Sequence, residues 1–211
     1  MARFFLVRHG QTAWNKDQRF RGRHDVGLSE QGHKEAELVA DVLEKEGIEH
    51  LYASPLSRSM DTLAPLAKRL DKEVVPLEGV IDLSFGEWEG KAAEEVKESY
   101  PDLYRKWQDS PEEVVFPGGE GLGEAQVRAM RSISRLAVEH SESVVAVCTH
   151  RVICKLIMLG LLNVKPDRFW SLRQDTACLN RFLYTPPEAV IITVNETHHL
   201  TPLGGTLQSD F

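Results

Sequence analysis

The chain has 211 residues, of which 42% are hydrophobic and 27% are charged, with 15 glycines and 10 prolines. This is the composition of an ordinary globular protein, and it excludes collagen-like and low-complexity classes. The formal net charge of -7 argues against a nucleic-acid partner, because binding a long polyanion usually requires a basic face.

The cysteines and the apolar segments indicate in which cellular compartment the protein is expected. Cys148, Cys154 and Cys178 lie among apolar neighbours without CxxC spacing, which predicts buried, reduced thiols. A strand predicted over residues 3–7 leaves no room for a signal peptide. The apolar stretch 152–162 is interrupted by a lysine and is too short to cross a bilayer. We therefore expect a cytoplasmic protein with no membrane partner.

The first half of the chain alternates between strand and helix patterns. Residues 4–7 are continuously apolar, which is typical of a strand covered on both faces. Ser29 is placed to cap a helix, and Pro65 predicts a kink or an early end in the following helix. In order, the predicted elements are a strand over 4–7, a loop over 10–28, a helix over 29–47, a strand over 48–53, a helix from 54 and a strand over 73–77.

The second half continues the alternation and completes the fold prediction. Its predicted elements are a helix over 92–108 broken at Pro101, a loop over 110–123, a helix over 122–140, a strand over 143–149, a helix to about 162, a strand pair over 178–185 and 190–194, and a tail over about 200–211. We find no linker and no repeat, so residues 1–211 are expected to form one α/β domain with a mainly parallel sheet.

Candidate chemistry follows the predicted strands. Two apolar strands each end in a histidine, His9 and His150, and a third leads within four residues to Arg58. Ligands of open α/β sheets bind beyond the carboxyl ends of the strands. These three regions are therefore expected to meet at one edge of the sheet.

Five sequence blocks, in a fixed order, resemble the histidine phosphatase (phosphoglycerate mutase-like) superfamily. The blocks are LVRHGQTAWN at 6–15, RFRGRHDVGLSEQG at 19–32, SPLSRSMDT at 54–62, FGEWEG at 85–90 and VCTHR at 147–151. A single RHG tripeptide is weak evidence, whereas five ordered blocks in one short chain are specific. The resemblance implies a three-layer α/β/α sandwich with a mainly parallel central sheet.

The resemblance also implies roles for the residues in these blocks. His9 is the expected nucleophile and would take the phosphoryl group on a ring nitrogen, which divides hydrolysis into two easier displacements. Arg8 and Arg58 are expected to clamp the phosphoryl oxygens, and His150 to stabilise the group in transit. Asn15 is expected to add a neutral donor, although it also suits an Asx turn. No metal and no cofactor is expected.

The general acid departs from the family pattern. The glutamate expected four residues before the glycine of the FGxWEG block is replaced by Asp82, one methylene shorter. Either the backbone lies closer to the site, or Asp82 acts through water, or Glu87 or Glu89 serves instead. We expect Asp82 to be the acid, because the glutamate of WEG is typical of a packing residue.

Two further departures concern charge near the substrate. Arg21 and Gly22 are expected to contact the substrate, and Arg21 stands where many family phosphatases carry glutamine. Arg151 replaces the glycine that commonly follows the second histidine. With Arg19 and Arg23, these arginines suggest a substrate with a second anionic group. The alternative is that Arg151 merely begins a helix and faces solvent.

Within the family, the chain most resembles a phosphatase acting on a small phosphate monoester. The RFRGRHDVGLS block resembles the mutase pattern, but the stretch after FGEWEG is short for a lid that keeps water from a phosphoenzyme. A phosphoglycerate mutase-type transferase is therefore the alternative. A non-catalytic phospho-ligand binding module is a third. The substrate and the oligomeric state stay open.

Overall fold

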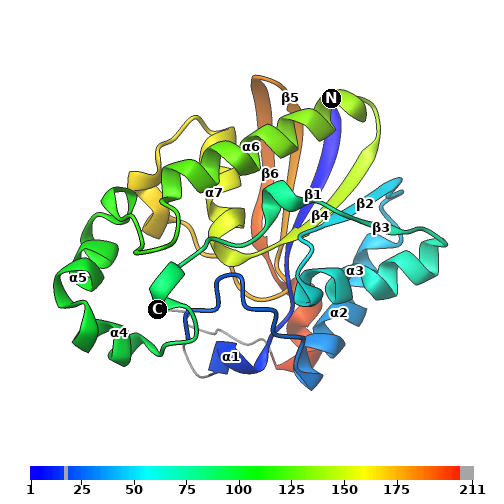
Figure 1. The fold of residues 1–211 in the computed structure, drawn as a ribbon. Coiled ribbons are helices and arrows are strands. Elements are labelled where there is room, and N and C mark those ends of the chain that lie inside the picture. Colours follow the sequence, from blue (N-terminus) through cyan, green and yellow to red (C-terminus); the bar gives the residue numbers. More distant parts are fainter. Residues whose placement is uncertain (17–18, 205–211) are drawn as a thin grey trace.

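The core of the protein is a six-stranded sheet, as seen in a computed structural model that describes residues 1–16 and 19–204. The strands lie in the order β3-β2-β4-β1-β5-β6 (Figure 1). The first four pair in parallel, and β5 and β6 add an antiparallel edge. The strands are β1 (Ala2–Arg8), β2 (His50–Ala53), β3 (Val74–Pro76), β4 (Val144–Thr149), β5 (Leu179–Thr185) and β6 (Glu188–Glu196).

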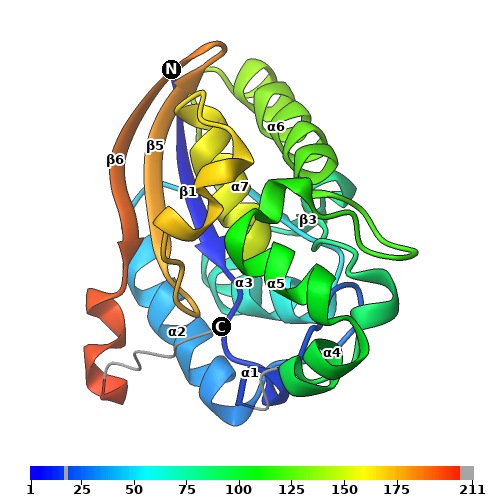
Figure 2. The same cartoon turned by 90° about the vertical axis from the view of Figure 1, so that its left-hand side faces the viewer.

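Helices cover both faces of the sheet, so the molecule has three layers. Helices α2 and α3 lie on one face, and α6 and α7 lie on the other (Figure 2). The α-helices are α1 (Ala13–Lys16), α2 (Glu30–Leu43), α3 (Ser57–Leu70), α4 (Ala93–Ser99), α5 (Pro101–Asp109), α6 (Leu122–Glu139) and α7 (Arg151–Leu161). Short 3-10 turns span Glu78–Val80, Gly86–Trp88, Pro111–Glu113, Pro166–Ser171 and His198–Leu203.

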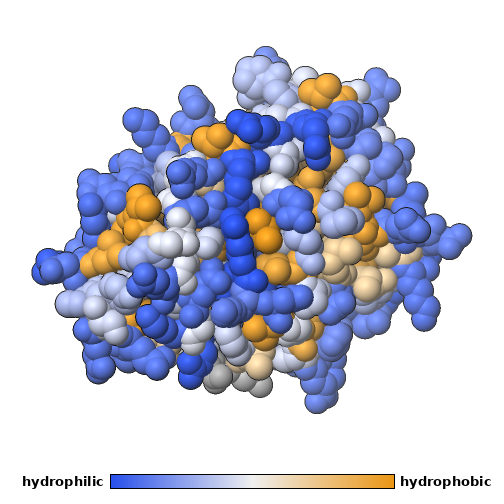
Figure 3. Space-filling view, viewed as in Figure 1, coloured by the Kyte–Doolittle hydropathy of each residue, from blue (hydrophilic) through white to orange (hydrophobic). Residues whose placement is uncertain are grey.

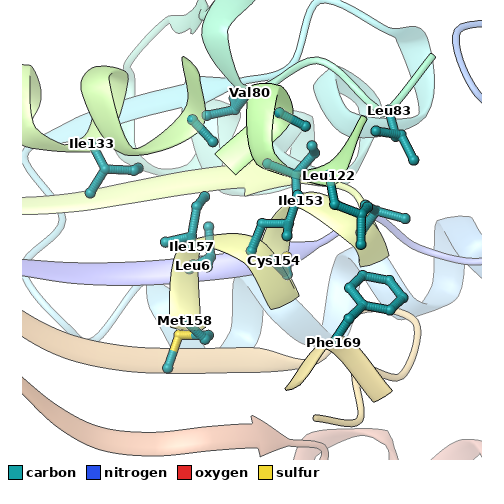
Figure 4. Packing of buried hydrophobic residues seen from close by; sticks show 14 of the residues in the cluster. Leu6, Val80, Leu83, Leu122, Ile133, Ile153, Cys154, Ile157, Met158 and Phe169 are labelled. Carbon is teal, nitrogen blue, oxygen red and sulfur yellow. The ribbon is translucent and has the colours of Figure 1, made fainter. Parts of the chain in front are cut away.

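Alternation along β1 divides the core into two clusters. Phe4 and Leu6 face α6 and α7, whereas Phe5 and Val7 face α2 and α3. Figure 4 shows Leu6 close to Ile157 of α7. Because both faces of β1 are buried, its sequence is continuously apolar rather than alternating.

The predicted α/β sandwich and its mainly parallel sheet are confirmed, including the helix break at Pro101 and the closing strand pair. The early end that Pro65 predicted as an alternative to a kink is wrong, because α3 runs through it to Leu70. Leu63, Leu66 and Ala67 are buried against the sheet. Tertiary packing of that face keeps the helix intact despite the missing proline N–H.

The end of the chain differs in part from the predicted tail. Residues His198–Leu203 form a 3-10 turn, and Leu200 is buried in the cluster beneath α2 and α3. The remainder of the predicted tail, 205–211, lies outside the described residues.

The surface in Figure 3 is mostly hydrophilic, with hydrophobic residues in separate spots. Within the described ranges, none of the helices combines the length and the apolar character needed to span a bilayer.

Candidate active site

The two histidines follow adjacent parallel strands. His9 comes directly after β1 and His150 directly after β4, and the His9 N–H extends the pairing by donating to the Thr149 carbonyl at 2.8 Å. The two imidazole centroids are 5.2 Å apart. Arg58, in the first turn of α3 beyond β2, reaches His150. The prediction that these three regions meet at one edge of the sheet is therefore confirmed.

His9 has one ring nitrogen anchored and the other available. Its Nδ1 lies 2.7 Å from the Gly10 carbonyl oxygen, which only accepts, so Nδ1 carries the proton and Nε2 keeps its lone pair. Nε2 is buried and has no hydrogen-bond partner among the described residues. Burial, followed by the charges of Arg58 and Arg8, lowers the pKa of His9 well below its ordinary value. The ring is therefore neutral at pH 7, as a nucleophile requires.

Asn15 is held through its side-chain oxygen, while its amide nitrogen has no partner among the described residues. Its Oδ1 accepts hydrogen bonds from the Thr12 N–H at 2.8 Å and the Thr12 hydroxyl at 2.9 Å, so it bonds back to the residue that precedes α1. The predicted Asx turn, in which the side chain bonds two residues forward, is therefore wrong. Its Nδ2 is buried without a hydrogen-bond partner in the described part of the chain. The local turn thus orients an amide that still has donors to offer.

His150 is held by a hydrogen bond at each ring nitrogen. Arg58 donates from Nε to His150 Nδ1 at 3.2 Å, so Nδ1 is the acceptor and the Nε2–H donates to the Ser54 hydroxyl at 2.7 Å. Burial and the adjacent Arg58 charge lower the pKa of His150 well below its ordinary value. The second imidazole is therefore also neutral.

Arg58 also holds the backbone of the neighbouring turn, in addition to contacting His150. It donates to the carbonyls of His24 and Gly22, each at 2.8 Å. Gly22 has a φ of +52°, and a Cβ there would overlap the Glu89 carboxylate, so the turn requires glycine. Arg8 is also buried and donates to the Gln174 carbonyl at 2.6 Å.

Of the three candidate acids, Asp82 is the one that contacts this group of residues. Its Oδ2 lies 3.1 Å from Arg58 Nη2 and 3.5 Å from His150 Nδ1, and the side chain is almost fully buried. Glu87 is exposed and accepts a hydrogen bond from the Tyr100 hydroxyl. Glu89 instead accepts from the Phe85 N–H at 3.0 Å, in a packing role.

A small cavity of about 20 Å³ lies beside Asp82. Arg21 and Arg151 line it together with Arg19. Arg151 is only 8% exposed, so the alternative in which it faces solvent is wrong. Arg23 is different: its side chain is 42% exposed and pairs with a glutamate at 3.0 Å.

Several residues that hold the site in place by hydrogen bonds were not assigned a role from the sequence. Ser54 and Thr62 fall in a recognised block without an assigned role, yet Ser54 holds His150 and the Thr62 hydroxyl accepts the Gly10 N–H at 3.0 Å. Gln174 acts through its backbone carbonyl, which no side-chain pattern reveals. Arg128 of α6, together with Glu120 in the loop before that helix, braces the segment of Asp82. Among the described residues, no group of three or more His, Cys, Asp or Glu side chains is arranged to hold a metal ion.

Comparisons with known proteins agree with this geometry. The model of the histidine phosphatase superfamily (branch 1) matches residues 4–197. Phosphoserine phosphatase 1 of Hydrogenobacter thermophilus is 34% identical over 200 residues, which cover 95% of each chain. Among solved structures, Bacillus stearothermophilus YhfR superposes with a TM-score of 0.90 at 22% identity, covering 95% of this chain and 100% of that one. A phosphoserine phosphatase mutant from Entamoeba histolytica, in complex with phosphoserine, gives 0.85 at 26% identity with the same coverage.

The family match over nearly the whole chain and the paired histidines at the sheet edge lead to one assignment. This chain belongs to branch 1 of the histidine phosphatase superfamily and is a phosphatase of small phosphate esters.

Proposed function

We propose that this phosphatase works through a phosphohistidine formed on Nε2 of His9. The observation that carries the proposal is the state of that atom: it is buried, lacks a hydrogen-bond partner among the described residues, and belongs to a ring held neutral with its proton on Nδ1. Such an imidazole is ready to attack phosphorus without first losing a proton.

The reaction then proceeds in two balanced steps. In the first, the Nε2 lone pair forms a bond to phosphorus while the bond from phosphorus to the leaving oxygen breaks, and Asp82 gives that oxygen a proton to release an alcohol. In the second, Asp82 takes a proton from water, whose oxygen attacks phosphorus and breaks the bond to Nε2. Inorganic phosphate leaves, and both His9 and Asp82 return to their starting states.

Cationic and neutral donors stabilise the phosphoryl group in transit. The Arg58 charge acts on both histidines and the Arg8 charge acts on His9. The Nδ2 of Asn15, which has no partner among the described residues, supplies a neutral donor. His150 lies across from His9 at a centroid distance of 5.2 Å. Fixed donors placed where charge develops lower the barrier more than mobile water does.

We extend the proposal to substrates whose leaving group carries a carboxylate, with phosphoserine as the test compound. Because Asp82 protonates the leaving oxygen, the rest of the leaving group lies beyond Asp82, in the direction of the cavity that Arg21 and Arg151 line. Arginine pairs well with carboxylates. The 34% identical relative named phosphoserine phosphatase 1 supports the same class.

Hydrolysis of phosphoserine and of p-nitrophenyl phosphate, both measured in EDTA, tests these proposals. We expect wild type to hydrolyse both, and His9→Ala to lose both, because the nucleophile is gone. Arg151→Met is expected to lose about 10-fold or more in kcat/KM on phosphoserine, and far less on p-nitrophenyl phosphate.

Arg131→Met, which changes an exposed arginine of α6, is the matched control and should behave as wild type. If His9→Ala hydrolyses these substrates at the wild-type rate, the assignment of His9 as the nucleophile is wrong. Equal losses on both substrates in Arg151→Met contradict the carboxylate assignment alone.

The thiols support a reducing cytoplasmic compartment as part of this proposal. Cys148, Cys154 and Cys178 are all free and buried, and burial raises the pKa of Cys178 to about 12. Immunodetection in fractions of the source cells tests this, and recovery outside the cytoplasm contradicts it.

A further inference from the structure

The Arg128 guanidinium, on α6, donates both to the segment that carries Asp82 and to the Glu120 carboxylate. Nη1 donates to the carbonyls of Gly79 at 3.0 Å and Ile81 at 2.7 Å, and Nη2 donates to the carbonyl of Asp82 at 3.0 Å. Its remaining contacts are to the Glu120 carboxylate, from Nε at 3.0 Å and from Nη2 at 2.6 Å. All five N–H donors of the side chain are thereby engaged.

We propose that Arg128, with Glu120, is the positioning residue that sets the location of the Asp82 carboxylate for proton transfer. The inference rests on the proposed function, in which Asp82 is the general acid and base. Arg128 contacts the backbone of the segment 79–82 and acts on the reaction through Asp82.

The shorter acid makes backbone position decisive. An aspartate has one rotatable bond fewer than a glutamate, so the location of its carboxylate depends more directly on the main chain. Asp82 Oδ1 is further fixed by the Leu83 N–H at 2.9 Å, which leaves Oδ2 facing Arg58 and His150. A displacement of about 1 Å in a reacting group costs on the order of 10²-fold in rate.

The segment is pressed closely onto α6, as this role requires. A Cβ on Gly79 would overlap the Ser132 hydroxyl, so glycine permits the close approach of the segment to the helix. On the other side of Asp82, Glu120 accepts the Ser84 N–H at 3.0 Å and a hydrogen bond from Arg23 at 3.0 Å. The backbone is therefore anchored both before and after Asp82.

Lysine cannot reproduce this arrangement. The planar Arg128 guanidinium donates to three carbonyls and a carboxylate through five N–H groups, whereas a lysine ammonium group has three donors on a single nitrogen. Arg128→Lys therefore keeps the charge and much of the aliphatic stem while releasing most of the backbone contacts.

The test compares Arg128→Lys with Asp82→Asn across leaving groups. The probes are p-nitrophenyl phosphate, whose leaving group departs without a proton, and phenyl phosphate and phosphoserine, whose leaving groups need one. We expect Arg128→Lys to lower kcat on the last two by about 10²-fold, with a much smaller effect on p-nitrophenyl phosphate and little change in KM. Arg135→Met, an exposed arginine on the same helix, is the matched control.

A double variant sharpens the comparison. If Arg128 acts through Asp82, then Arg128→Lys added to Asp82→Asn should cost nothing further on phenyl phosphate, so the two losses are not additive. Where Arg128→Lys does not yield folded protein, Glu120→Gln removes the charge that the guanidinium pairs with and should show the same selectivity on a smaller scale.

The outcomes separate the inference from the function on which it rests. Uniform losses on every substrate, or additive losses in the double variant, overturn the role of Arg128 while Asp82→Asn still shows leaving-group selectivity. No selectivity in Asp82→Asn itself overturns the acid assignment and the inference together. Matching selectivity in both single variants supports both.

Discussion

At the residue scale, hydrogen bonds to one atom of a side chain in the site orient the side chain and determine which of its other atoms can contact a substrate. His9 is anchored at Nδ1, Asn15 at Oδ1 and His150 at both nitrogens. The motifs made the identities of these residues predictable. Which nitrogen is available could not be predicted. For His150 it depends on a hydroxyl and a guanidinium from other segments, and for His9 it depends on the orientation of the adjacent Gly10 carbonyl, which residue types do not reveal.

The acid is the residue at which the family pattern was least secure, and it yields a direct prediction. Asp82→Asn should lower kcat on phenyl phosphate by about 10²- to 10⁴-fold, because a positioned acid no longer protonates the leaving oxygen. Glu87→Gln should leave kcat close to wild type, since Glu87 is exposed and bonded to Tyr100. Steady-state kinetics with both purified variants checks this. Equal losses, or a larger loss in Glu87→Gln, would falsify the assignment.

At the scale of elements, the N-terminus of α2 is tied to the loop that carries the nucleophile. The Ser29 hydroxyl caps the helix by accepting the Gly32 N–H at 3.1 Å and donates to the Gln11 side chain at 2.9 Å. The cap was predictable from sequence, because serine before an apolar-periodic run is a strong local signal. The hydrogen bond from Ser29 to Gln11 joins segments 18 residues apart and could not be predicted from the local pattern.

Removal of this cap should be measurable as lost stability. We expect Ser29→Ala to lower the free energy of unfolding by about 1 kcal/mol, because the Gly32 N–H loses its acceptor. Ser29→Asp retains an acceptor and should recover most of that loss. Denaturant unfolding of the three proteins checks the ordering, and an unchanged midpoint in Ser29→Ala contradicts it.

The same scale explains why α3 does not end early at Pro65. A proline inside a helix removes one hydrogen bond, and sequence alone reports only that cost. The compensating burial of Leu63 and Leu66 depends on where the sheet lies, which local pattern does not contain. Continuously apolar strands and strongly periodic helices were predictable because their signals are local.

At the scale of the whole molecule, folding buries both histidines in neutral form, and this makes stability depend on pH. Burial, then Arg58, lowers the pKa of His9 and of His150 well below the ordinary value. Below about pH 6.5 the unfolded chain binds protons that the folded chain does not, so stability falls as pH falls. The stabilisation that each neutral histidine contributes is fully present above the pKa of the unfolded chain. It decreases as the pH falls toward the lower pKa of the folded protein.

Unfolding measured between about pH 7 and about pH 5.5 tests this linkage, over a range in which most carboxylates stay ionised. We expect each histidine to contribute at most about 1.4 kcal/mol per pH unit to the decline. His9→Asn, which has no such titration, should show a shallower decline. A His9→Asn profile parallel to that of wild type would argue against the buried neutral state.

Assembly of distant segments also limits what sequence can predict about the site. Arg128, which braces Asp82 from α6, lies 46 positions further along the chain and donates to backbone carbonyls. A backbone acceptor leaves no residue-type signature. The strand ends, in contrast, are gathered by a general rule of α/β sheets, and for that reason the catalytic edge was predictable.

The central claim is that His9 carries the phosphoryl group, and trapping the intermediate tests it most directly. Wild type mixed with phosphoserine labelled at phosphorus and quenched in alkali should hold label in an acid-labile, alkali-stable bond, located by peptide mapping on His9. The His9→Ala protein should hold none. Label found on another residue, or turnover by wild type with no phosphoenzyme at any quench time, would contradict the account.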